Sequence, residues 1–514
     1  MLAILASGWY LRQEWTALGT FGFPLDDGWI HAQFAKNLAS GYGLAFNPGE
    51  PSAGSTSPLW TLVLAAVIAV GASPVAAAKA GGVVLGAATA ALGSRLARTM
   101  TGSAAAGVLA GFALAVSARL TWAGASGMEV GLACTLLIAT LLVYLTRPER
   151  TATWGVLSGL CGTARPELFP LVGALLVHAL VWGPIDVDPP PWSRLRRLVP
   201  AAAGFVVVAG VYALANWYGG GTWLPTTFAA KTKAQGLSYA IAAVDGRELV
   251  RSLTSRPIEH LSLLARFVFE QSQVLFATLV LGELAAAGVV SAAPCARGSG
   301  LVAGVVVGLS ALMGALAPDV PLYGQEGRYV LPFVSLLFVL GAVGVWALGQ
   351  TLHVRWPAVA LALVALARLG SQDVQFASRY VAQVANIEHL QVEMGRWLAA
   401  HTAGDTVVAT NDIGAIGVFS GRRVVDTEGL ITPAMIPFKR DRRQLDYLFL
   451  AKPDVLVVFP EWYPHVVGRT DLFTEIHRIS VPRVSAAHDA MVVYRTPWSR
   501  PGTLALAADP HERE

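Results

Sequence analysis

Two adjacent carboxylates, Asp26 and Asp27, are the side chains best placed to do chemistry. They follow the first apolar stretch of the chain, in the run 23–31 (FPLDDGWIH). Two like charges side by side at a membrane surface repel each other, so a divalent cation, a basic partner or a bound proton should compensate them. Such a pair suits a membrane enzyme that must deprotonate a hydroxyl group. The alternative is that either Asp caps the helix that starts near Gly28.

Two further residues could act with this pair. His31 follows Asp27 by four positions, so on a helix it faces the pair or a substrate, and we favour the role of a structural partner. Glu129 could bind a divalent cation jointly with Asp26 and Asp27, because carboxylate oxygens suit Mg²⁺, Mn²⁺ or Ca²⁺. The alternative for Glu129 is a helix cap. The sequence thus predicts a candidate metal site at Asp26, Asp27 and Glu129.

The composition indicates that a membrane protein positions these residues. Of 514 residues, 54% are hydrophobic and 14% are charged, with a mean hydropathy of +0.54. Soluble domains carry about 25% charged residues. The net charge of +4 does not suggest a nucleic-acid partner. The three cysteines, Cys134, Cys161 and Cys295, indicate neither a disulfide framework nor a cysteine metal site.

The apolar runs predict a helical bundle with about eleven spans. The stretch 152–182 is interrupted by Arg165-Pro166-Glu167, which favours two short helices with the tripeptide at the turn. The run 58–72 is short for a span and is expected to be half-inserted. The stretch 2–10 is also short, which suggests that the sequence begins within the first membrane helix. Runs long enough to span lie at 75–95, 103–120, 129–146, 198–217, 270–291, 300–317, 330–349 and 356–370.

Arginines in short loops set the orientation of this bundle. The loops at 95–98, 147–150 and 194–197 should be cytoplasmic, because basic residues accumulate on that side. The polar motifs then share the extracytoplasmic side, which predicts a common site there. These motifs are the acidic pair, residues 126–129, residues 165–167, Lys231, Arg328 and the C-terminal region.

Composition divides the chain into a membrane domain at 1–370, with outer loops at 13–74 and 218–266, and a polar region beyond it. An amphipathic helix is predicted at 28–40. Strands near 406–409, 423–425 and 455–458 alternate with helices near 386–402 and 441–451, which predicts an extracytoplasmic α/β domain at 371–496. Residues 497–514 are expected to form a disordered tail.

Several motifs together resemble a known family. In the stretch 26–60, an acidic pair precedes an amphipathic helix, an Asn47-Pro48-Gly49-Glu50 turn and the run 55–60 (STSPLW). This order resembles the first outer loop of the GT-C superfamily of polyprenyl-phosphate-sugar glycosyltransferases. More narrowly, it resembles the branch that contains mycobacterial terminal arabinofuranosyltransferases. Further matching motifs lie at 126–129, 165–167, 217–219, 224–231, 328–332, 412–417 and 426–430, although Thr226 stands where asparagine is usual.

The resemblance implies a polyprenyl-phosphate-linked sugar donor and a glycan or lipid-linked acceptor on the outer face of a bacterial inner membrane. Asp27 or Asp26 would be the base in an inverting reaction. Lys231, Arg328 and Arg165 are the candidate phosphate ligands, since guanidinium and ammonium groups pair with phosphate. Each has a structural alternative. For Lys231 the alternative is snorkelling at a helix end. For Arg328 it is a pair with Glu326 or with a loop carbonyl, and for Arg165 it is a pair with Glu167 or a contact at the helix break.

A competing class is a transporter or flippase for polyprenyl-linked lipids. It would also need outward-facing cations and an aqueous cavity. However, it does not require an acidic pair on a surface helix, and it more often contains inverted repeats, which this sequence does not show. A third class is a binding or assembly protein in which the C-terminal domain carries the function.

Overall fold

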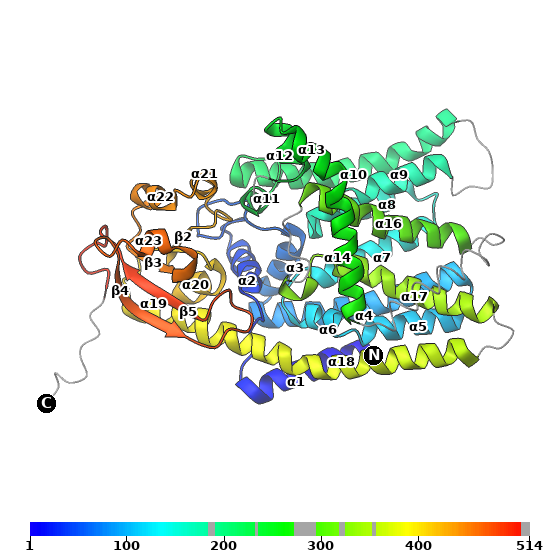
Figure 1. The fold of residues 1–514 in the computed structure, drawn as a ribbon, viewed down its shortest axis with the longest axis horizontal. Coiled ribbons are helices and arrows are strands. Elements are labelled where there is room, and N and C mark those ends of the chain that lie inside the picture. The colour runs from blue at the N-terminus through cyan, green and yellow to red at the C-terminus, as the bar shows by residue number, and fades with distance from the viewer. Residues whose placement is uncertain (183–190, 232–234, 272–294, 318–323, 352–355, 505–514) are drawn as a thin grey trace.

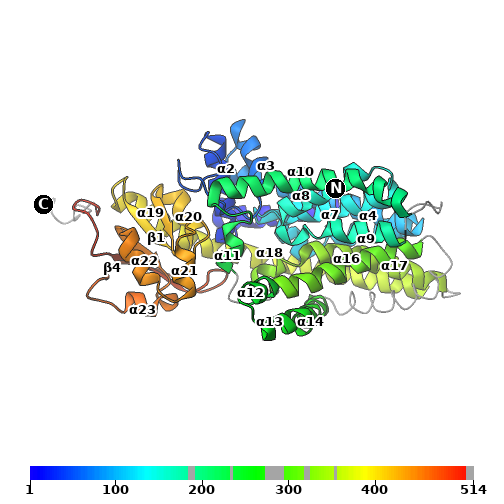
Figure 2. The same cartoon turned by 90° about the horizontal axis from the view of Figure 1, so that it is seen from above.

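The computed structural model describes residues 1–514 apart from 183–190, 232–234, 272–294, 318–323, 352–355 and 505–514. A bundle of helices occupies most of the chain, and a small α/β unit lies at one end of it (Figure 1). Seen from above, α2 and α3 lie on one side of the bundle and α12, α13 and α14 on the other (Figure 2). The predicted span at 270–291 lies almost wholly outside the described residues.

The first half of the bundle contains short elements as well as long helices. Serine side chains cap three of them: Ser57 at α3, Ser73 at α4 and Ser103 at α5 each accept a main-chain N–H bond. The elements are α1 (Leu2–Leu18), α2 (Asp26–Ala39), α3 (Pro58–Ala69), α4 (Pro74–Thr101), α5 (Ala104–Ala115), α6 (Ala118–Ala125), α7 (Val130–Thr146), α8 (Thr151–Ala164), η1 (Pro166–Leu168) and α9 (Leu171–Val181).

The second half begins with a long helix and ends with a helix that leaves the bundle. The predicted loop 218–266 contains four helices. The elements are α10 (Pro191–Gly220), α11 (Thr226–Lys231), α12 (Leu237–Ala242), α13 (Gly246–Leu253), α14 (Ser255–Gln271), α16 (Cys295–Leu316), η3 (Gly324–Gly327), α17 (Leu331–Thr351) and α18 (Trp356–Ile387).

Five helices in the described part of the chain are long and apolar enough to cross a membrane, or six if the bent pair α5 and α6 forms one span. Several other apolar helices have only 10–17 residues. The count of about eleven spans therefore stays a prediction. The interruption of 152–182 is confirmed, because α8 ends at Ala164 and Arg165 takes an extended conformation before Pro166.

The C-terminal unit is built on a five-stranded sheet in the order β2-β1-β3-β5-β4. The first three strands are parallel, as the predicted alternation of strands and helices requires, and β4 and β5 add an antiparallel edge. Its elements are η4 (Glu388–Val392), α19 (Glu393–His401), β1 (Val407–Thr410), α20 (Ile413–Ser420), β2 (Arg423–Asp426), α21 (Met435–Arg440), α22 (Gln444–Ala451), β3 (Val455–Val458), η5 (Pro460–Trp462), α23 (Pro464–Val467), β4 (Thr474–Ser480) and β5 (Ala490–Arg495).

Two predicted boundaries differ from the structure. Residue 370 lies inside α18, which runs without a break from the bundle into η4 and α19 under the sheet (Figure 1). Residues 497–504, which were predicted to belong to a disordered tail, are ordered, and the rest of that predicted tail lies outside the described residues. Arg500 donates to Asp454 and Asp405, and Leu504 pairs with Thr402. The first feature joins the α/β unit to the bundle, and the second holds residues 500–504 against the α/β unit itself.

Candidate functional site

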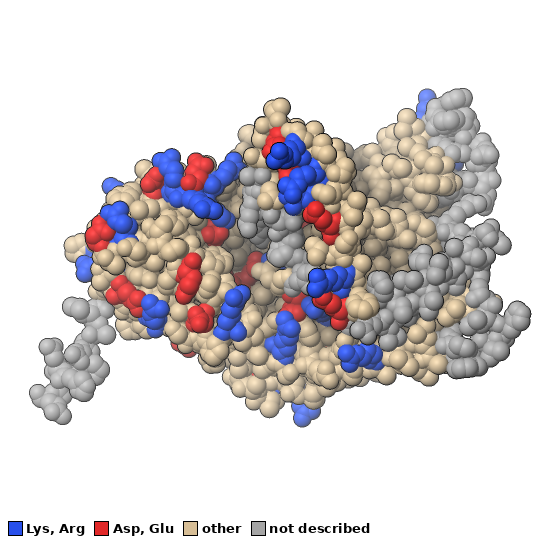
Figure 3. Space-filling model, in the orientation of Figure 1, with Lys and Arg blue, Asp and Glu red and all other residues tan. Residues whose placement is uncertain are grey.

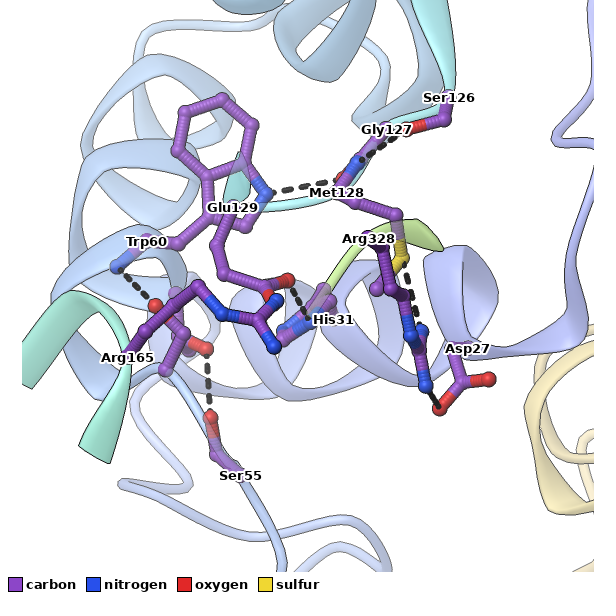
Figure 4. Close-up of polar contacts among 12 residues, drawn as sticks. Asp27, His31, Ser55, Trp60, Ser126, Gly127, Met128, Glu129, Arg165 and Arg328 are labelled. Carbon is purple, nitrogen blue, oxygen red and sulfur yellow. Dashed lines mark hydrogen bonds and ion pairs between the residues drawn. The ribbon is translucent and has the colours of Figure 1, made fainter. Parts of the chain in front are cut away.

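The first turn of α2 directs Asp27 into the junction between the bundle and the α/β unit. Asp27 and His31, one turn apart, point from the same face of the helix (Figure 4). An Asp27 carboxylate oxygen lies 3.3 Å from Nη2 of Arg328, whose side chain is 4% exposed, whereas that of Asp27 is 27% exposed. The Asp27 carboxylate is therefore the more accessible member of a largely buried ion pair.

Glu129 forms the second centre of charge. Its oxygens lie 2.6 Å from Nη1 of Arg165 and 3.0 Å from Nε2 of His31. Nε of Arg165 lies 2.5 Å from Glu167, so the guanidinium bridges two carboxylates. His31, Glu129 and Arg165 are each at most 5% exposed. The sequence predicted these residues as a group, and the structure places them in contact with one another.

Electrostatics keeps Glu129, Arg165 and Arg328 charged despite their burial. Burial alone would raise the pKa of Glu129, but Arg165, His31 and Arg328 hold its pKa below the usual range. Burial likewise opposes the charge on Arg165, but Glu167 and Glu129 raise its pKa. Burial would also lower the pKa of Arg328, and Asp27, Tyr329 and Glu129 instead raise it. Both guanidinium groups are thus permanent cations.

Tyr329 links the two ion pairs and was not singled out from the sequence. The guanidinium carbons of Arg165 and Arg328 lie 4.9 Å and 5.0 Å from the centre of its ring. Its hydroxyl accepts a bond from Nη2 of Arg328 at 3.1 Å. Nε of Arg328 is buried and has no partner among the described residues. A bound anion could therefore satisfy this N–H group.

An unusual backbone turn places Arg328. Gln325, Glu326 and Gly327 all have positive φ, at 52°, 58° and 74°. Gln325 and Glu326 are not glycines, and residues with side chains seldom adopt this left-handed backbone conformation. Glu326 is buried and holds the turn, because it lies 2.8 Å from Arg119 and 2.7 Å from Arg379. The predicted alternative of a pair between Glu326 and Arg328 is not formed.

The run STSPLW positions the turn that carries Glu129. Ser57 caps α3, and the indole N–H of Trp60 donates to the main-chain oxygen of Gly127 at 2.9 Å (Figure 4). Gly127 has φ of +79°, and a Cβ atom there would lie 2.4 Å from the ring of Phe23. A glycine is therefore needed immediately before the segment that directs Glu129 towards Arg165.

Asp26 has a different environment from its neighbour. Its carboxylate accepts bonds from the main-chain N–H groups of Gly414 and Ala415, both at 2.7 Å, at the first turn of α20. A carboxylate at this end of a helix is stabilised by the unpaired amides and the helix dipole. The predicted alternative, in which either Asp caps the helix that starts near Gly28, is not formed, because Leu25 is the N-cap of α2 and no described side chain caps that helix. Asp26 instead caps α20 of the α/β unit.

The Asn-Pro-Gly-Glu turn also contacts the α/β unit. The Asn47 side chain donates to the oxygen of Val424 and accepts from its N–H, both at 2.9 Å, which imitates strand pairing at the edge of β2. Glu50 lies 2.6 Å from Arg423. Thr226 donates to the main-chain oxygen of Leu430. These motifs of the sequence resemblance therefore join the two parts of the molecule.

Several buried acids lie close to one another near the junction. One face of the molecule is hollowed beside the α/β unit, and charged side chains gather around that hollow (Figure 3). Burial raises the pKa of Asp26, and the nearby Asp412 and Asp27 raise it further, against the two amide bonds that lower it. Burial also raises the pKa of Asp412 to about 6. Asp426, whose oxygens hold the 428–431 turn, has a pKa raised to about 6 by burial. Asp412 and Asp426 begin two of the motifs matched from the sequence, but neither was predicted to be a site residue.

The three carboxylates predicted to share a divalent cation do not converge. Asp26 is bonded to α20, Glu129 to Arg165 and His31, and Asp27 to Arg328. Among the described residues, no group of three or more His, Cys, Asp or Glu side chains is arranged to hold a metal. The residues present therefore do not fit the predicted Mg²⁺, Mn²⁺ or Ca²⁺ site. Lys231 ends α11, and its side chain lies outside the described atoms.

Comparisons with known proteins address the fold. No curated protein matches the sequence. A family model described as a domain of unknown function, DUF8728, matches residues 382–499, which form most of the α/β unit. The whole chain is similar to ArnT from Cupriavidus metallidurans bound to undecaprenyl phosphate, with a TM-score of 0.56 and 12% identity over 97% of this chain and 99% of that chain.

A second similar structure is the archaeal oligosaccharyltransferase AglB from Archaeoglobus fulgidus, in complex with an inhibitory peptide and a dolichol-phosphate. Its TM-score is 0.56 at 11% identity, over 98% of this chain and 75% of that chain. A structure of the Archaeoglobus fulgidus oligosaccharyltransferase in complex with Zn and sulfate has a TM-score of 0.55 at 12% identity, over 96% of this chain and 73% of that chain. These proteins are GT-C glycosyltransferases. The predicted resemblance to the GT-C fold is thus confirmed.

Proposed function

We propose that this protein is a membrane glycosyltransferase that transfers a sugar from a polyprenyl-phosphate donor to a glycan or lipid-linked acceptor. The observation that carries the proposal is the Asp27–Arg328 pair, in which an accessible carboxylate lies against a buried, permanently charged guanidinium. This pair lies at the junction of a GT-C fold with its α/β unit. A sugar-phosphate reaction needs both a base and a fixed cation.

In this proposal Asp27 is the general base. The acceptor hydroxyl oxygen attacks the anomeric carbon of the donor while Asp27 takes the hydroxyl proton. The bond between that carbon and the phosphate oxygen breaks, and polyprenyl phosphate leaves with the bonding electrons. Attack on the face opposite the phosphate inverts the anomeric configuration. Asp26, the other predicted base, is committed to the N–H groups of α20, which supports assigning the base to Asp27.

The leaving phosphate would bind beside Arg328. The Nε–H group of Arg328 lacks a partner among the described residues, and a phosphate oxygen would satisfy it. Arg165 is bonded to Glu129 and Glu167, so it supports the site through Glu129 and the Tyr329 ring. Lys231 remains the second phosphate ligand of the proposal. His31 is the structural partner of Glu129.

The finer assignments follow the sequence resemblance. We place the site and the α/β unit on the extracytoplasmic side of a bacterial inner membrane, because the basic short loops then lie in the cytoplasm. The donor sugar we propose is arabinofuranose. The support is the order of the acidic pair, the amphipathic helix, the Asn47–Glu50 turn and the run ending at Trp60.

The test is sugar transfer by the purified full-length chain in detergent. It uses a radiolabelled polyprenyl-phosphate arabinofuranose donor, a short arabinofuranoside acceptor and a matched pyranose donor. We expect labelled product with inverted configuration from the furanose donor. Product from the pyranose donor alone would overturn the sugar assignment. If the chain is folded and binds donor but transfers sugar from neither donor, the proposal that it is an enzyme would be overturned, and a lipid transporter or flippase would be favoured.

A further inference from the structure

A cavity lies on the face of α2 that points away from the ion pairs. Trp29, Ala32, Gln33 and Lys36 line it from α2, whereas Asp27 and His31 project from the opposite face of the same helix. Its volume is about 360 Å³. This lies within the range of about 300–1,000 Å³ typical of small-molecule sites. The cavity is therefore large enough for a ligand and separate from the proposed reaction centre.

The walls combine aromatic rings with polar side chains. Phe419 of α20 packs edge-on against Trp29, with ring centroids 4.8 Å apart, and Phe21 is 40% exposed. Arg396 lies over the Phe419 ring at 5.3 Å and pairs with Glu388 at 2.8 Å. Aromatic faces pack against the C–H faces of sugar rings, and planar polar groups beside them bind hydroxyls.

Two buried polar atoms in the wall residues lack partners. The indole Nε1 of Trp29 and Oε1 of Gln33 have no hydrogen-bond partner within the described residues, although the residues are only 4% and 8% exposed. Buried donors and acceptors are normally satisfied, so such atoms require an explanation. One is a donor and the other an acceptor, a combination that a hydroxyl group can serve. Both are covered in this conformation, so pairing requires the side-chain adjustment common at binding sites.

We propose that this cavity binds a saccharide of one or two rings, outside the reaction centre. The inference rests on the proposed function in one respect: it assigns the ligand as a non-reacting sugar unit of the acceptor glycan. Saccharide is favoured over a lipid headgroup because Arg396 pairs with both Glu388 and Glu393, which leaves Lys36 as the one lining cation without a carboxylate partner among the described residues. A phospholipid headgroup would be better served by unpaired cations.

The experiment measures binding directly, by saturation-transfer NMR on the full chain in detergent. The probes are an arabinofuranose disaccharide and maltose. Val418, which lines the cavity, is changed to Trp to fill it, and V484W, at a 47% exposed position of the same unit, is the matched control. We expect V418W to abolish binding of the arabinofuranose disaccharide and V484W to leave that binding unchanged. Q33M nearly keeps the volume and removes the acceptor, together with the Nε2 donor that bonds to the main-chain oxygen of Phe46, and it should weaken binding about fivefold.

Several results would overturn the proposal. The first is that neither saccharide binds, and the second is that V418W binds as well as the parent chain. The third is that the chain binds phosphatidylglycerol vesicles but neither saccharide, which would identify a lipid site. If V418W fails to fold, Q33M decides the outcome. The variant D27N separates this proposal from the proposed function: it should bind the disaccharide normally and transfer no sugar. If the chain binds saccharide at the cavity but has no transferase activity, the proposed enzymatic function would be refuted, whereas the proposed saccharide site would stand.

Discussion

Changing Asp26 and Asp27 one at a time should separate attachment of the α/β unit from chemistry. The two carboxylates are adjacent in sequence, but Asp26 accepts two amide bonds at 2.7 Å from α20, whereas Asp27 contacts Arg328 at 3.3 Å. Asparagine has nearly the same shape as aspartate and keeps one acceptor oxygen. Each substitution thus removes charge and one acceptor without opening a cavity.

The magnitudes follow from these contacts. In D26N one of the two amides loses its acceptor, which costs about 2 kcal/mol for a charge-assisted bond. Relief of repulsion with Asp412 and Asp27, which raise the Asp26 pKa, offsets part of this cost. A net loss of about 1 kcal/mol should increase exchange of the α20 amides about fivefold. In D27N the base is lost, and general-base catalysis contributes about 10²–10⁴-fold in rate.

The assays are amide hydrogen exchange at Gly414 and Ala415 and sugar transfer under saturating donor. D27N should lose transfer and keep the exchange protection of the parent. D26N should exchange faster and keep much of its transfer activity. D471N, at an exposed aspartate paired with Arg469, is the control for loss of a carboxylate. The reasoning is refuted if D27N transfers sugar at more than a third of the parent rate while D26N is inactive with α20 fully protected.

Three further changes test the structure around the site. E326Q leaves the mostly buried Arg119 without its carboxylate, so the free energy of unfolding, measured by chemical denaturation, should drop by about 3 kcal/mol. Affinity for the donor, measured by donor binding, should also weaken because Arg328 moves. The raised pKa of Asp412, about 6, means that the folded state binds its proton more tightly than the unfolded state. The contribution of Asp412 to stability is therefore present below about pH 4 and is lost as pH rises to about 6. The thermal midpoint of D412N should be higher than that of the parent at pH 7.5, and it should depend less on pH between 4 and 7. N47A removes both bonds to Val424, so exchange of β2 should increase by the equivalent of about 1–3 kcal/mol, and unchanged protection would show that the turn does not hold the strand.

Local rules of sequence predicted several of the placements around Asp27. Proline and a costly arginine mark the break at Arg165, and the structure has an extended residue there. Four-residue spacing places His31 beside Asp27 on α2. Basic short loops assigned Glu129, Arg165 and Arg328 to one side of the bundle, and the structure brings them within contact distance of one another or of shared partners.

What the sequence could not give depends on pairing between distant segments. Asp26 and its partner Gly414 are 388 positions apart, and no local pattern indicates that contact. The antiparallel edge was missed because β4 (TEIHRIS) is largely exposed and lacks a clear apolar alternation. The continuity of α18 was missed because a change from apolar to polar composition resembles a domain boundary, although a helix can continue through it.

The acidic pair itself shows why one motif can serve two purposes. Successive residues on a helix point about 100° apart, so adjacent carboxylates in its first turn face different neighbours. Asp26 faces the α20 amides, and Asp27 faces Arg328. The contact that attaches the α/β unit therefore also fixes the rotation of α2, and with it the direction of Asp27. A longer or shorter side chain at 26 should shift the neighbouring carboxylate relative to Arg328, so D26E, which keeps the charge, should lower the transfer rate while the chain stays folded.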